Sequence, residues 1–192
     1  MIYYYETPKY CIAHNPKVAC TSFAHAIIKQ FYPDINKKIE QNSSIFNGPT
    51  YILSCPKTQE PKKPIVCLIR NPIDRFISAI NQTQINIETA IHCLLNDKEY
   101  HFPIYSKPRK LKDDGHFREQ SKIVTQDTHL FKFPEEIEIM ANFIGITSKI
   151  ENLNKSNIKL RLTKDQEKFI YDYYYKDFIL YEKVSKFVNL KF

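Results

Sequence analysis

The chain has 192 residues, the length of one ordinary domain, and we expect a single domain over residues 1–192. Apolar residues make up 43% of it and aromatic residues 14%, which excludes a disordered segment. No uncharged apolar run approaches the ~18–20 residues of a membrane span, and the start MIYYYETPKY lacks the features of a secretory signal. We therefore expect a cytoplasmic protein. Its net charge of +7 favours an anionic partner, and its 3 glycines leave little room for a glycine-rich nucleotide loop.

The cysteines indicate a reducing compartment. They are odd in number, form no CxxC pair and lie mostly among apolar residues, which predicts buried free thiols at Cys11, Cys20, Cys55, Cys67 and Cys93. A zinc site would have to be built from His14, Cys20, His92 or Cys93, and their spacing matches no ligand pattern. We expect no metal.

The first predicted unit is a strand, a loop and a helix. Tyr10 to Ala13 is a short buried strand that stops at Asn15-Pro16. A helix follows, capped by Thr21 or Ser22 and ended by Pro33.

A second unit repeats this arrangement. Ile65 to Ile69 is a continuous apolar run, typical of a strand covered on both faces. Asn71 is the expected N-cap of the next helix, with Pro72 in its first turn. The polar face of that helix carries Ser78 and Arg75, for which we expect a surface ion pair with Asp74 or another carboxylate.

The remaining segments continue the alternation of strands and helices. The patterns predict a strand at Tyr51–Leu53, a helix at Ile87–Leu95, a long polar loop at Lys98–Lys122, a strand at His129–Phe133, a helix from Pro134 to Ile144 ended by Gly145, and a C-terminal helix that opens with a Thr163–Gln166 capping box. This order predicts an α/β fold with a mainly parallel sheet. The loops that follow the first two predicted strands, Pro16 to Ser22 and Arg70 to Asn71, would both lie at the edge of the sheet formed by the carboxyl ends of its strands.

The first loop, PKVACTS, contains the parts of a phosphate site. Lys17 supplies a positive charge, Thr21 and Ser22 supply hydroxyls, and the start of a helix supplies unpaired amides. It is not a Walker A loop, because the lysine precedes the turn and glycine is absent. An ordinary capped turn is the alternative.

The second loop offers a second cationic site. Arg70 ends the buried strand with a planar fork suited to phosphate oxygens, and Ser78 adds a small donor from the following helix. For Ser78 the alternative is a solvated helix face.

Together the loops resemble those of sulfotransferases that act on chondroitin, dermatan and related glycans, and of their bacterial or viral relatives. The family's P-K-x-[AG]-C-[TS]-[NS] loop is matched by Pro16, Lys17, Ala19, Cys20, Thr21 and Ser22. Its R-[DE]-P-x-x-R-[LF]-x-S-A loop is matched by Arg70, Pro72, Arg75, Phe76, Ser78 and Ala79, with Asn71 in place of the acid. Weaker similarity covers DGHFREQ and the terminal LTKDQEKFIYDYYYKDFILY.

The resemblance implies a P-loop-like three-layer fold, in which helices flank the sheet. It also implies in-line transfer of a sulfuryl group from 3′-phosphoadenosine 5′-phosphosulfate to a hydroxyl of a saccharide or other small acceptor. The first loop, with Pro16, Lys17, Ala19, Cys20, Thr21 and Ser22, would bind the 5′-phosphosulfate, while Arg70 and Ser78 would bind the 3′-phosphate. Lys17 would stabilise the charge that develops on the leaving phosphate.

The acceptor hydroxyl needs a base, and His116 is the leading candidate because DGHFREQ is similar to the family's D-x-H-[FW]-x-x-Q stretch. The alternatives are His14, His101, Glu119, or a merely ordering role for His116. A basic cluster could recruit an anionic saccharide or form a solvated face; it consists of Lys107, Arg109, Lys110 and Lys112.

Two other classes of function remain open at this point. A P-loop kinase is disfavoured by the missing glycine-Lys-Ser/Thr triplet and by the lack of an acidic magnesium ligand at a strand end. A nucleic-acid-binding module would explain the charge, but no such motif is present and the basic residues are dispersed, so we expect no nucleic-acid partner.

Overall fold

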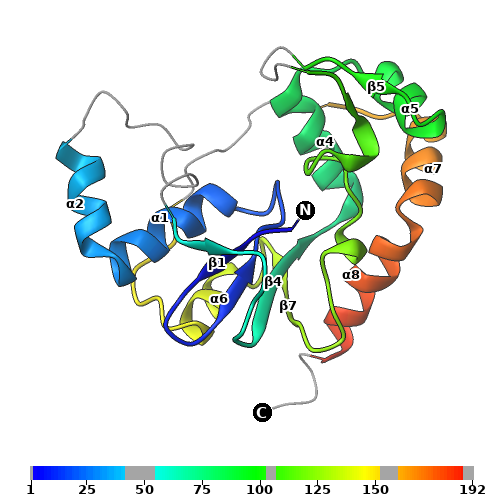
Figure 1. Ribbon diagram of the computed structural model, residues 1–192. Coiled ribbons are helices and arrows are strands. Elements are labelled where there is room, and N and C mark those ends of the chain that lie inside the picture. The colour runs from blue at the N-terminus through cyan, green and yellow to red at the C-terminus, as the bar shows by residue number, and fades with distance from the viewer. Residues whose placement is uncertain (1, 42–54, 103–106, 152–159, 188–192) are drawn as a thin grey trace. The chain divides into compact units, whose positions relative to one another are not determined.

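The computed structural model describes residues 2–41, 55–102, 107–151 and 160–187. It consists of two compact units (Figure 1). Unit 1 contains Met1–Ile69 and Ile123–Lys155, and unit 2 contains Arg70–Lys122 and Ser156–Phe192. Each unit is described by itself. The strand predicted at Tyr51–Leu53 lies outside the described residues.

A five-stranded sheet with the strand order β3-β1-β2-β4-β7 organises unit 1. Its strands are β1 (Tyr4–Glu6), β2 (Cys11–Ala13), β3 (Lys57–Thr58), β4 (Ile65–Arg70) and β7 (His129–Phe133). The strands of the two strand–loop–helix units are parallel, as predicted, and the structure makes them neighbours, with Cys11 opposite Ile65 and Ile12 opposite Val66. The sequence did not predict β1 and β3, which add antiparallel pairs. The mixed α/β class is confirmed.

Both faces of β4 are buried, as its unbroken apolar run predicted. Val66 and Leu68 pack in one core with residues of α1 (Cys20–Phe31) and α6 (Ile137–Phe143). Cys67 and Ile69, which alternate with them, are also buried. The core of the protein therefore covers β4 on both faces.

Two helix starts in unit 1 differ from the prediction, whereas α1 ends at Phe31, before Pro33, as predicted. The helix α1 begins after Ala19 and not after Thr21 or Ser22, which lie buried inside its first turn. Pro33 also starts a helix that the sequence did not predict, α2 (Pro33–Gln41), because the fixed φ of proline suits a first helical position. The helix α6 starts only at Ile137, since the backbone before it makes a turn in which Glu136 Oε2 accepts from Lys132 N at 2.6 Å.

Unit 2 is built mainly of helices: α4 (Pro72–Thr83), α5 (Ile87–Leu95), α7 (Lys164–Tyr173) and α8 (Tyr175–Phe187). The caps of α4 and α7 are confirmed, since Asn71 Oδ1 accepts from Ile73 N and Asp74 N, and Thr163 and Gln166 form the capping box. The C-terminal segment is two helices, because the chain departs from helical geometry at the buried Tyr174.

The segment Lys98–Lys122 is more ordered than the polar loop that the sequence predicted. It contains the antiparallel pair β5 (Glu99–Tyr100) and β6 (Arg109–Lys110), followed by the 3₁₀ turns η2 (Leu111–Asp113) and η3 (Gln120–Lys122). Three apolar side chains, Phe102, Leu111 and Phe117, are buried in the core of unit 2 and fix this segment.

Candidate functional site

The first loop has an unusual backbone that no glycine supports. Lys17 has φ 71° and Ala19 has φ 57°, so two L-residues occupy the left-handed region immediately before α1. Such positions cost a non-glycine residue roughly 1–2 kcal/mol. Alternation of left- and right-handed residues also turns successive backbone N–H groups toward one point, where they can bind an anion. The first turn of α1 contains no acidic residue, and Ala19 provides no side-chain cap. The backbone is therefore suited to an anion.

The side chains of the loop hold this backbone in place. The Cys20 thiol donates to Asn15 O at 2.7 Å, and Asn15 Nδ2 donates to Leu68 O at 2.9 Å, which ties the loop to β4. Thr21 and Ser22 are buried, while Pro16 and Lys17 are half-buried. The predicted residues of this loop are thus brought together at the end of β2.

A small apolar pocket lies under the loop, lined by residues that include Tyr5, Val18 and Met140. Its volume of about 10 Å³ suffices for about one water molecule and excludes a nucleotide. Burial raises the pKa of the Tyr5 phenol, whose ring lies 5.3 Å from the ring of His14. The half-buried His14 therefore packs against a ring that lines this pocket.

The second predicted cation, Arg70, is the last residue of β4 and is half-buried. Burial lowers the pKa of its guanidinium, and the charge of Asp74 acts in the opposite direction. A bound anion would compensate the desolvation of this cation. Ser78 is half-buried two turns into α4, in the same unit as Arg70.

The expected surface ion pair of Arg75 is wrong. Arg75 is only 2% exposed, and its Nη2 donates to Gly115 O at 2.9 Å. Its charge also lowers the pKa values of Tyr174 and Asp177, in each case against the larger effect of burial. Arg75 therefore belongs to the core of unit 2 and holds the segment that carries His116.

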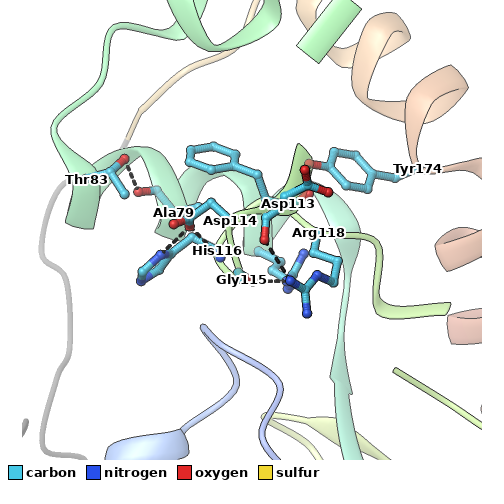
Figure 2. Close-up of polar contacts among 10 residues, drawn as sticks. Ala79, Thr83, Asp113, Asp114, Gly115, His116, Arg118 and Tyr174 are labelled. Carbon is cyan, nitrogen blue, oxygen red and sulfur yellow. Dashed lines mark hydrogen bonds and ion pairs between the residues drawn. The ribbon is translucent and has the colours of Figure 1, made fainter. Parts of the chain in front are cut away.

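His116 lies on a tight turn, residues 114–117, that is fixed from several sides (Figure 2). Asp114 Oδ1 accepts from His116 N at 2.9 Å and lies 2.7 Å from His116 Nδ1. Arg75 binds the carbonyl of Gly115, and Tyr174 Oη donates to Phe117 O at 2.6 Å. With Asp114 accepting from Nδ1, the opposite ring nitrogen Nε2 is the one that can take a proton.

The other predicted bases are placed less favourably. His101 is exposed, and the Glu119 carboxylate lies 2.6 Å from Lys122 Nζ. The basic cluster is partly neutralised, because Lys110 and Lys112 each lie 2.8 Å from the Asp97 carboxylate.

Two further predictions concern metals and thiols. The described part of the chain contains no group of three or more His, Cys, Asp or Glu side chains that could hold a metal ion. All five cysteines are free thiols, four of them buried and Cys20 half-buried. None of the described helices is long and apolar enough to cross a membrane.

Sequence reasoning missed three side chains that support this site. Asp114 holds His116, Gln120 holds the backbone of Arg70, and Asp177 holds the backbone of Gln120. All three lie in DGHFREQ or in the C-terminal segment, two stretches that the sequence analysis singled out. The sequence did not show which residues they would contact.

Comparisons of the chain with protein-family models, with curated proteins and with solved structures find no match in any of the three. The hypothesis that the chain is a sulfotransferase therefore rests on the residues of the two loops and on the two stretches just named.

Proposed function

We propose that this protein is a sulfotransferase with a P-loop-like arrangement, which uses 3′-phosphoadenosine 5′-phosphosulfate and a hydroxylated acceptor such as a saccharide. The observation that carries the proposal is the backbone of the first loop. Two non-glycine residues there, Lys17 and Ala19, keep a left-handed conformation, which is typical of backbone strained for a function. Lys17 places a positive charge in the same loop.

The proposed reaction transfers the sulfuryl group from the 5′-phosphate oxygen to the acceptor oxygen, and the acceptor proton passes to a base. Amides at the start of α1 would hold the 5′-phosphate, and Lys17 would neutralise the charge left on its bridging oxygen. Arg70 and Ser78 would bind the 3′-phosphate. His116 would take the acceptor proton at Nε2, a role that its hydrogen bond to Asp114 supports.

Titration calorimetry with 3′-phosphoadenosine 5′-phosphate tests the donor site first, with ATP as a competitor. Lys17→Ala and Arg70→Ala should each weaken binding about 10-fold or more, because each removes a charge-assisted contact. The exposed residues Lys29 and Arg161 provide matched controls, and their alanine variants should bind within about 2-fold of wild type.

Binding of the bisphosphate that exceeds binding of ATP would justify a screen of saccharide acceptors with radiolabelled donor. A folded protein that does not bind the bisphosphate would reduce both loops to ordinary turns and exclude the proposed activity.

A further inference from the structure

The side chain of Gln120 forms hydrogen bonds with both polar backbone groups of Arg70, the N–H and the C=O. Arg70 N donates to Gln120 Oε1 at 2.9 Å, and Gln120 Nε2 donates to Arg70 O at 2.8 Å. Gln120 is fully buried and lies 50 positions further along the chain. A carboxamide offers an acceptor and a donor side by side, so Gln120 pairs with Arg70 as a neighbouring strand would.

Gln120 is itself fixed by the carboxylate of Asp177, a residue of α8. Asp177 Oδ2 accepts from Gln120 N at 2.7 Å, and Asp177 Oδ1 accepts from Ser121 N at 2.8 Å. Asp177 is fully buried, and both of its oxygens are used on consecutive amides of η3. Hydrogen bonds to a carboxylate are shorter and stronger than those between neutral groups. The three residues form a relay from α8 through η3 to the end of β4.

This relay ends at Arg70, whose side chain carries the guanidinium. A guanidinium recognises phosphate by two parallel hydrogen bonds, so its orientation matters as much as its charge. Binding groups must be held within about 0.5 Å of their productive position, which requires support from neighbouring residues. Gln120 bonds the backbone of Arg70, Asp177 bonds the backbone of Gln120, and both side chains are buried.

We infer that Gln120 and Asp177 are positioning residues for Arg70, and that they set the preference of this protein for a nucleotide with a 3′-phosphate. The inference rests on the proposed function, since it assumes that Arg70 binds that phosphate. A purely structural role would affect folding and leave the preference between nucleotides unchanged.

The test compares affinities for 3′-phosphoadenosine 5′-phosphate and adenosine 5′-phosphate, because their ratio isolates the 3′-phosphate. Wild type should prefer the bisphosphate, and Arg70→Ala should abolish that preference. Asp177→Asn, which replaces one acceptor oxygen by a donor that faces an N–H group, should lower the preference about 10-fold while affinity for the monophosphate stays within about 2-fold. The matched control is Asp172→Asn, at an exposed carboxylate paired with Lys168, which should change neither affinity.

Gln120→Glu provides the same measurement if Asp177→Asn does not fold. It preserves the volume of the side chain and the contacts with Asp177 but removes the donor to Arg70 O, and its preference should fall in the same way. If the folded variants keep the wild-type preference, the positioning role is wrong and the proposed function stands. If wild type itself shows no preference for the bisphosphate, the assignment of Arg70 fails and the inference fails with it.

Discussion

Replacing Ala19 by glycine should stabilise the protein, contrary to the usual effect of glycine next to a helix. Ala19 has φ 57° and ψ 25° at the position just before α1. Relief of the left-handed strain is worth roughly 1–2 kcal/mol, and the greater freedom of glycine in the unfolded chain offsets about 0.4–1 kcal/mol of it. We expect Ala19→Gly to raise the free energy of unfolding by about 0.5–1 kcal/mol.

The control is the same substitution at Ala26, which is buried inside α1. There glycine relieves no strain, and Ala26→Gly should destabilise the protein by about 1 kcal/mol. Urea unfolding followed by far-ultraviolet circular dichroism measures both variants, since the chain lacks tryptophan. If Ala19→Gly lowers the unfolding midpoint as Ala26→Gly does, then residue 19 is not left-handed and the argument for an anion-binding backbone is refuted.

The remaining predictions concern buried ionisable groups. Arg75→Met should destabilise the protein by roughly 3–5 kcal/mol, because it leaves Gly115 O and the carboxylate of Asp177 without their buried cation. The control Arg161→Met, at an exposed position, should change the free energy of unfolding in urea by less than about 0.5 kcal/mol. Equal effects of the two substitutions would contradict the role of Arg75 as a buried cation. Burial raises the pKa of the Cys55 thiol to about 12. The unfolded chain therefore loses this proton from about pH 8.5 upward while the folded chain keeps it, so stability falls as pH rises, by about 1.4 kcal/mol per pH unit above that value until the folded pKa is reached. Cys55→Ala should flatten this alkaline slope in urea titrations at successive pH values, and an unchanged slope would show that the thiol does not titrate in this way.

The sequence predicted elements well where one local signal determines the structure. The run Ile65–Ile69 and the caps at Asn71 and Thr163 are confirmed, because an apolar strand and a side-chain cap depend on residues close in the chain. The polar pattern of α4 misled us at Arg75. Its position on the helix predicted solvent, but the guanidinium is buried by a segment 40 positions away that supplies the carbonyl of Gly115.

The backbone conformation of the first loop could not be predicted from the sequence either. Nothing in PKVACTS specifies that Lys17 and Ala19 are left-handed, since alanine and lysine normally avoid that region. Thr21 and Ser22 are good capping residues, and local preference placed the helix start there. The structure begins the helix at Cys20, whose thiol bonds back to Asn15 O, so a side-chain contact inside the loop replaced the expected cap.

The contacts of unit 2 connect the C-terminal stretch and DGHFREQ to the two proposed site residues Arg70 and His116. A residue in the C-terminal stretch, Asp177, holds Gln120, which in turn holds the backbone of Arg70. Tyr174, from the same stretch, donates to the carbonyl of Phe117 next to His116. A scaffold of this kind needs buried polar groups in fixed pairs, since a buried donor or acceptor that loses its partner costs about 1–3 kcal/mol. The proposed roles of Arg70 and His116 would therefore depend on buried residues that touch no ligand, and these residues lie in DGHFREQ and in the C-terminal stretch.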